Sequence, residues 1–125
     1  MSGRKHDKEK TRLDLIAPDA LEALGRVLTY GARKYDPRNW ERGMAWSRVI
    51  GACLRHVNAI NAGEDLDRES GLPHASHLMC DAMFLAAYYL RGIGIDDRNR
   101  IVGQTVRLLS DPGADPEITI EEEIK

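Results

Sequence analysis

Residues able to bind a divalent metal ion are concentrated between positions 55 and 81. Four acidic residues fall within six positions there, followed by two histidines and an aspartate; in chain order these are Glu64, Asp65, Asp67, Glu69, His74, His77 and Asp81. Spacings of three and four residues place the last three on one face of a helix. The stretch therefore predicts a metal site formed by an acidic loop and the helix that follows it.

The same residues also have a purely structural interpretation, as a solvated loop followed by satisfied interior histidines. The metal interpretation is favoured because an apolar run, 82–90, follows Asp81 directly, so the helix is predicted to be buried. Buried imidazole and carboxylate groups need partners. A shared cation would supply one and would relieve the repulsion among the acids.

The predicted cofactor is Mg²⁺ or Mn²⁺, with two or more ions, because hard cations take oxygen ligands. The predicted metal ligands are Glu64, Asp67, His77 and Asp81. His77 could instead hydrogen-bond a water on the ion, and His74 is predicted to be a supporting group or a proton carrier. Glu69 is the candidate base that accepts a proton from water.

A segment rich in cations and aromatics, residues 31–40, is suited to a nucleotide. Lys34 could reach phosphate, Asn39 could contact a base edge, and Tyr35 or Trp40 could stack on the base. Arg55 is a further candidate phosphate ligand. The structural alternatives are a loop whose aromatics fill the core and, for Arg55, a surface ion pair.

The composition is that of an ordinary globular protein, with 42% hydrophobic and 30% charged residues and a net charge of −2. This balance argues against general nucleic-acid binding. No apolar stretch reaches the roughly 18 residues of a membrane span, and the charged N-terminus does not resemble a signal peptide. We therefore expect a cytoplasmic protein, in the host cytoplasm if it is phage-encoded. The two cysteines are predicted to be reduced and buried.

Three strong helices and a weaker fourth are predicted from apolar periodicity and helix-end signals. The expected ranges are 18 to about 30, 47 to about 62 with Ser47 as N-cap, 73–90, and a weaker amphipathic helix over 98–109. Buried positions are predicted at Leu21, Leu24, Val27 and Leu28 in the first, and at Val49, Ile50, Cys53, Leu54, Val57 and Ile60 in the second. A strand pattern is confined to 118–120.

These elements predict an all-α helical bundle with a metal site between its helices. We expect three parts: a charged flexible segment at 1–12, a catalytic domain at 13–95, and a C-terminal helix with an acidic tail at 96–125. The strongly apolar third helix suggests that part of the surface is buried against another copy of the chain.

Four segments, in this order, resemble the phage dATP/dGTP diphosphohydrolases, which belong among the MazG-like all-α nucleotide pyrophosphatases. They are LDLIAPDAL, YGARKYDPRNW, RHVNAINAGEDLDRESGLPHASH and the apolar helix that follows, covering about residues 10–91. One difference concerns the metal ligands. MazG-like proteins present ExxE and ExxD pairs, whereas this chain has Glu64 and Asp67, then His77 and Asp81.

The resemblance implies metal-dependent hydrolysis of a purine deoxynucleoside triphosphate to the monophosphate and pyrophosphate. It also implies a homodimer or homotetramer, and a role in phages whose DNA contains 2-aminoadenine, for which dGTP is converted to dGMP. Two alternatives remain open. One is a different metal phosphohydrolase, and the other is a non-catalytic helical adaptor that binds a nucleotide or a protein.

Overall fold

The computed structural model describes residues 2–99, 105–107 and 117–119. Its described elements are, in chain order, the 3-10 helix η1 (Leu13–Leu15), α1 (Pro18–Lys34), the 3-10 helix η2 (Asn39–Arg42), α2 (Trp46–Asn61), α3 (His74–Arg91), β1 (Thr105–Arg107) and β2 (Glu117–Thr119). The predicted all-α bundle is confirmed for the three main helices.

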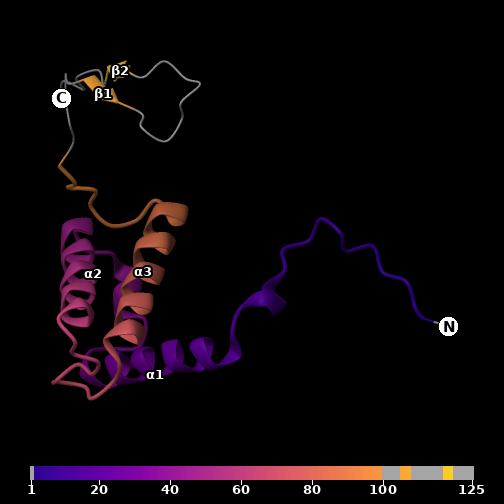
Figure 1. The fold of residues 1–125 in the computed structure, drawn as a ribbon, viewed down its shortest axis with the longest axis horizontal. Helices are drawn as coiled ribbons and strands as arrows, with labels where there is room; N and C mark the ends of the chain where they lie inside the picture. The colour runs from indigo at the N-terminus through magenta and orange to yellow at the C-terminus, as the bar shows by residue number, and fades with distance from the viewer. Residues whose placement is uncertain (1, 100–104, 108–116, 120–125) are drawn as a thin grey trace.

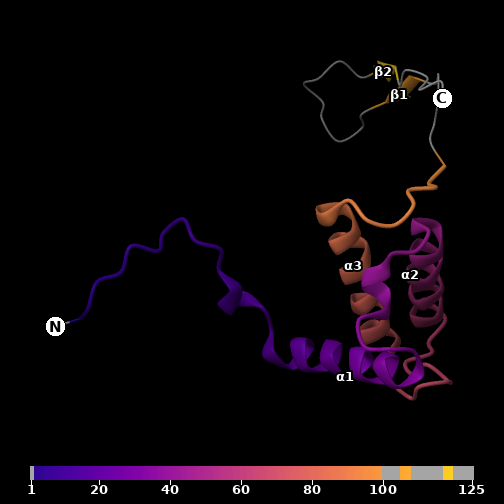
Figure 2. The same ribbon diagram turned by 180° about the vertical axis from the view of Figure 1, so that it is seen from behind.

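α2 and α3 lie side by side, and α1 crosses the end of the pair where α2 ends and α3 begins (Figures 1 and 2). The chain before α1 extends away from the helices (Figure 1). Trp46, Val49 and Tyr88 form the buried centre between α2 and α3. Partly buried hydrophobic residues pack around this centre: Trp40, Met44, Ile50, Phe84, Leu85 and Ile93. This cluster therefore lies toward the end of the helix pair away from α1.

α1 is one turn longer than predicted. Pro18 occupies its first turn as expected, but the helix continues past Gly31 to Lys34, and the Tyr35 N–H bonds the Gly31 carbonyl at 2.8 Å. Arg33 and Lys34 are favourable at this end because the helix dipole is negative there. The extra turn puts Lys34 one turn beyond Tyr30, on the same face of the helix.

The predicted N-cap of α2 is wrong. The cap position belongs to Ala45, and Ser47 is the second residue of the helix. Its backbone N–H and hydroxyl both donate to the carboxylate of Asp97, at 2.9 and 2.5 Å. Asp97, which is distant in sequence, thus accepts hydrogen bonds at the start of α2, where the N-cap residue Ala45 has no side chain that could do so.

The predicted ends of α2 and α3 are confirmed. Gly63 follows the cap residue of α2 with φ 90°, and Gly92 caps α3 with φ 66°. These backbone conformations are accessible to glycine at little cost. The turn at Gly63 leads the chain from α2 into the acidic loop, residues 64–73.

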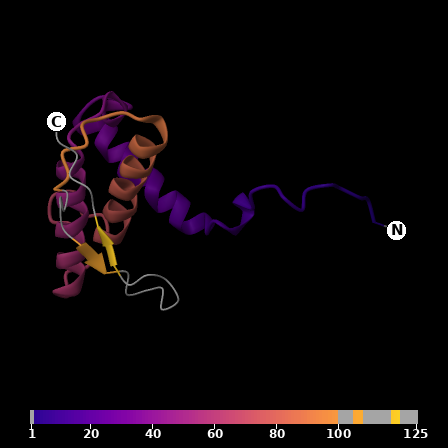
Figure 3. The same cartoon turned by 90° about the horizontal axis from the view of Figure 1, so that it is seen from above.

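The predicted fourth helix over 98–109 is wrong where the structure describes it. Thr105–Arg107 is a strand that pairs antiparallel with Glu117–Thr119, with Val106 opposite Ile118 (Figure 3). Threonine and valine favour extended backbone, and the pairing overlaps the strand pattern predicted at 118–120. Most of the segment, including 100–104 and 108–109, lies outside the described residues.

Part of the predicted core of α2 is exposed. Val49 is buried, but Leu54, Val57 and Ile60 have 63, 46 and 39% of their surface accessible. Leu21 of α1 is also exposed, whereas Val27 is buried. The reason is that α2 and α1 both pack chiefly on α3, so the side of α2 that faces away from α3 is left uncovered by the described helices.

Among the residues with described placement, no helix is long and apolar enough to cross a membrane.

Candidate functional site

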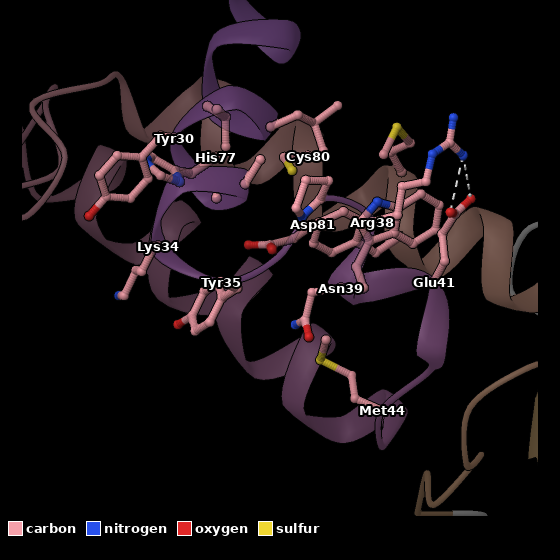
Figure 4. Close-up of a pocket in the computed structure, with 18 of the residues that line it drawn as sticks. Tyr30, Lys34, Tyr35, Arg38, Asn39, Glu41, Met44, His77, Cys80 and Asp81 are labelled. Atoms are coloured by element: carbon pink, nitrogen blue, oxygen red, sulfur yellow. Dashed lines mark hydrogen bonds and ion pairs between the residues drawn. The ribbon is translucent and has the colours of Figure 1, made fainter.

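A cavity of about 710 Å³ opens between α1, η2 and α3 (Figure 4). Histidines and acids line one end of it: His56, Asp67, Glu69, His77 and Asp81. Aromatic residues, methionines and arginines line the rest, including Tyr35, Arg38, Trp40, Met44, Phe84 and Arg91. The volume falls within the range of pockets that bind small molecules.

Three imidazoles meet beside this cavity. Nδ1 of His56, on α2, lies 2.9 Å from Nδ1 of His74, on α3. The ring of His77 stacks on His56 with centroids 5.0 Å apart and planes at 11°. Burial and the two neighbouring imidazoles lower the pKa of His56, and burial lowers the pKa of His77. Both rings therefore favour the neutral form, which is the form that binds a metal ion.

The acidic loop is held against α3 by hydrogen bonds around Asp67. Its carboxylate accepts bonds from the Ser70 N–H and hydroxyl at 2.8 and 2.9 Å. The Ser70 hydroxyl also lies 2.7 Å from Nε2 of His77. Burial raises the pKa of Asp67, but the Ser70 bonds and the nearby imidazoles outweigh burial, so the net pKa is lowered. Asp67 is therefore an ordered carboxylate next to His77.

Glu64 supports the buried His74 instead of facing the cavity. Its carboxylate lies 2.8 Å from Nε2 of His74, a residue with only 5% of its surface exposed. Arg68 donates to the same carboxylate at 2.7 Å. The bonds from His74 and then Arg68 lower the pKa of Glu64. Glu64 thus remains ionised and holds the orientation of the His74 ring.

Asp81 lies one turn beyond His77 and points into the cavity (Figure 4). Its carboxylate is 3.7 Å from Nε2 of His56, and its side chain is only 18% exposed. Burial raises the pKa of Asp81 to about 6. A carboxylate with this pKa can hold or release a proton near neutral pH.

Lys34 connects α1 to the acidic loop across the histidine-rich end of the cavity. Its ammonium forms an ion pair with Glu69 and lies over the Tyr35 ring, 5.3 Å from the centroid. The Tyr30 ring meets the His77 ring edge-on. The bond from Lys34 lowers the pKa of Glu69, and the Tyr30 hydroxyl also lowers the pKa of Glu69. This end of the cavity therefore contains the Lys34 ammonium, paired with Glu69.

The other end has an aromatic wall. The Trp40 ring stacks on Phe84, with centroids 4.9 Å apart and planes at 17°. Glu41 accepts bonds from Arg38 at 3.1 Å and from Arg91 at 2.9 Å, and Arg91 lies over the Trp40 ring. Trp40 is consequently part of the packed core as well as of the wall.

Most residues predicted from the sequence for the site gather at this cavity. Those that line it are Lys34, Tyr35, Asn39, Trp40, Asp67, Glu69, His77 and Asp81. Glu64 and His74 adjoin it, whereas Arg55 is exposed on α2 and is not among the lining residues.

His56 is the site residue that was missing from the predicted metal ligands. The sequence contains a signal for it, because His56 follows Val49 and Cys53 at helical spacing on the inward face of α2. A polar residue on an apolar face requires a partner. His56, Asp67 and His74 each offer one ligand atom, and these atoms lie within 4.8 Å of one another. The donor set fits a divalent ion.

Comparison with known proteins identifies relatives of this chain. Residues 1–98 match the family described as dATP/dGTP diphosphohydrolase, N-terminal. Over 85 residues the chain is 40% identical to the dATP/dGTP diphosphohydrolase of Salmonella phage PMBT28. The alignment covers 68% of this chain and 29% of that relative, so the chain spans under a third of its length. No solved structure matches.

Proposed function

This chain belongs to the dATP/dGTP diphosphohydrolase N-terminal family, and we propose that it hydrolyses dGTP to dGMP and pyrophosphate with the help of a divalent ion. dATP and GTP are further candidate substrates. The chain spans only 29% of the length of its phage relative.

One observation carries the proposal, namely that the same cavity has two different ends. Histidines, acids and Lys34 line one end, and an aromatic wall lines the other. A nucleoside triphosphate has a matching division between charged phosphates and a flat base. We assign the phosphates to the histidine-rich end and the base to the part lined by Tyr35, Asn39 and Trp40. Tyr35 is 59% exposed and so has a face free for stacking, whereas one face of Trp40 is covered by Phe84.

Mg²⁺ or Mn²⁺ is the proposed cofactor, with the predicted carboxylates and imidazoles holding it. His56, Asp67 and His74 fit an ion by their proximity, and His77 and Asp81 adjoin them. When bound, the ion would supply charge neutralisation at the phosphates and polarisation of a phosphoryl oxygen. Glu64 is proposed to orient the His74 ring through its hydrogen bond to Nε2, without binding the ion itself.

Glu69 is the proposed base. In the structure its carboxylate is paired with Lys34. A triphosphate that draws the Lys34 ammonium to its own oxygens would free Glu69 to accept a proton. Water then attacks the α-phosphorus, its proton passes to the Glu69 carboxylate, and the bond to the bridging oxygen breaks to release pyrophosphate. His74 is proposed to act through the ion that it helps to hold, with its Nε2 kept in place by Glu64.

We further propose that the protein acts as a homodimer or homotetramer. The support is the exposed apolar side of α2, where Leu54 and Val57 are 63 and 46% accessible. In a phage with 2-aminoadenine in its DNA, the reaction in the host cytoplasm would supply dGMP for that base and deplete dGTP. A solution mass equal to one 14.0 kDa chain would overturn the oligomer part of the proposal.

The deciding experiment incubates the full chain with each dNTP and GTP, with Mg²⁺, Mn²⁺ or chelator, and separates the products by anion exchange. Metal-dependent dGMP and pyrophosphate are expected. Asp67→Asn should abolish most activity, while Asp65→Asn, the same change on an exposed acid two positions away, should not. Release of inorganic phosphate or triphosphate would indicate a different phosphohydrolase. Intact dGTP that remains tightly bound would indicate a nucleotide-binding module.

A further inference from the structure

We propose that His56, His74 and Asp67 form a nitrogen-rich centre that selects a divalent transition ion, of the class that binds imidazole, over Mg²⁺. Zn²⁺ and Co²⁺ represent this class. The inference deepens the proposed function and rests on it only in assuming that an ion belongs at the histidine-rich end of the cavity. It assigns the innermost ligands to two imidazoles in place of the carboxylate set predicted from the sequence, and it thereby replaces Mg²⁺ as the ion of the proposed function.

The first support is the convergence of two ring nitrogens. The Nδ1 atoms of His56 and His74 face each other at 2.9 Å. One ligand atom from each of His56, His74 and Asp67 lies within 4.8 Å of the other two. Around a tetrahedral ion with metal–nitrogen distances of about 2.0–2.1 Å, two ligand nitrogens lie about 3.3 Å apart. The two rings would therefore have to separate by only a few tenths of an ångström.

The second support is the partner on the far side of His74. Nε2 lies 2.8 Å from Glu64, which is further held by Arg68 at 2.7 Å. A carboxylate accepts, so Nε2 carries the proton and donates, and Nδ1 of a neutral ring is left with a lone pair directed at His56. A carboxylate behind an imidazole is the usual support of a metal-binding histidine.

The third support is the fixed geometry of the remaining ligand. Two hydrogen bonds from Ser70 hold Asp67, and Ser70 also bonds His77. The backbone N–H of His74 donates to the Asp65 carbonyl at 2.8 Å, which ties the loop to the start of α3. Ligands held by the fold in this way bind an ion without first having to be ordered.

The preference over Mg²⁺ follows from the donor atoms. Mg²⁺ requires oxygen ligands and retains much of its water, whereas imidazole suits Zn²⁺ and other transition ions. Two of the three innermost donors here are nitrogens. The nearby Glu64 cannot readily add an oxygen, because its carboxylate is engaged by His74 and Arg68. A simple hydrogen bond between His56 and His74 is the competing explanation, and it predicts no ion binding.

The test measures ion binding in the absence of nucleotide. The full chain, prepared without a polyhistidine tag and stripped with chelator, is titrated separately with Zn²⁺, Co²⁺ and Mg²⁺ by calorimetry. Visible absorption of Co²⁺ reports nitrogen ligation. We expect Zn²⁺ and Co²⁺ to bind at least about 100-fold more tightly than Mg²⁺. Equal affinities, or no Zn²⁺ binding at all, would overturn the proposal.

Variants separate the centre from adventitious binding. His56→Ala should lose the Co²⁺ absorption, and Glu64→Gln should keep it while weakening affinity by about 10–100-fold. His6→Ala is the matched control, since His6 is exposed in the N-terminal segment. Circular dichroism checks the fold, and Glu64→Gln keeps the test decisive if His56→Ala unfolds. Loss of affinity in His6→Ala equal to that in Glu64→Gln would refute the assignment.

Failure of this proposal and failure of the proposed function give different results. Selective Zn²⁺ or Co²⁺ binding by a chain that leaves every nucleotide intact supports the centre and contradicts the hydrolase. Hydrolysis by a chain that binds Mg²⁺ as tightly as Zn²⁺ supports the hydrolase and contradicts the nitrogen-rich centre.

Discussion

The hydroxyl of Tyr88 donates a 2.6 Å hydrogen bond to the backbone carbonyl of Trp40, 48 positions earlier in the chain. Tyr88 is fully buried on α3, and Trp40 lies in η2. The bond joins the core of the helix pair to the segment that forms the aromatic wall of the cavity. The position of that wall therefore depends on a residue that does not line the cavity itself.

Tyr88→Phe should destabilise the fold, because it leaves the Trp40 carbonyl without its buried donor. The expected loss is about 1–3 kcal/mol in the free energy of unfolding. Urea denaturation followed by circular dichroism measures it. Tyr89→Phe is the matched control, since Tyr89 is 73% exposed. Equal stabilities for the two variants would show that the hydroxyl contributes nothing.

Asp97→Ala should weaken the start of α2, and the effect should depend on pH. The hydrogen bonds from Ser47 lower the pKa of Asp97. A carboxylate whose pKa is lowered by folding contributes stability above its unfolded pKa, and that contribution is lost as pH falls through the folded value.

The difference in stability between wild type and Asp97→Ala should thus be largest near pH 7 and shrink below about pH 4. Urea midpoints measured across this range test the expectation. Asp7→Ala removes one exposed carboxylate from the N-terminal segment and controls for the change in net charge. A difference that does not vary with pH would mean that the ionised carboxylate is not the stabilising group.

Lys34→Met should raise the Michaelis constant for the nucleotide on the order of tenfold, because it removes a charged hydrogen-bond donor from the proposed phosphate end. Arg33→Met serves as the control, being an exposed cation on the same helix that does not line the cavity. Arg55→Met tests the remaining predicted phosphate ligand and should have little effect, because Arg55 also lies outside the lining. Steady-state kinetics on the three variants measure the Michaelis constants. A larger increase for Arg33→Met than for Lys34→Met would contradict the assignment of Lys34 to the phosphates.

The Cys80 thiol should be inert in the folded protein. Burial raises its pKa to about 12, so almost no thiolate is present at pH 8. Alkylation followed by mass spectrometry should label Cys80 only after denaturant is added. Rapid labelling of Cys80 in buffer would contradict the packing of α3 against its neighbours.

The sequence by itself determined the local features of this protein. Helical periodicity, Pro18 and the glycines at 63 and 92 located the three main helices, because helix starts and stops are set within a few residues of chain. The crowded acids and the spacing of His74, His77 and Asp81 likewise identified the region of the site. The family-like motifs in the chain agree with the matched family.

Tertiary structure decided which of these groups meet. His56 joins His74 because α2 and α3 pack side by side, and Asp97 caps α2 because the chain returns after α3. Glu64 faces His74 instead of the cavity because the acidic loop packs against the start of α3. Spacing along one helix fixes the face on which a residue lies, whereas a hydrogen bond between elements depends on packing angles and loop paths set by the whole chain.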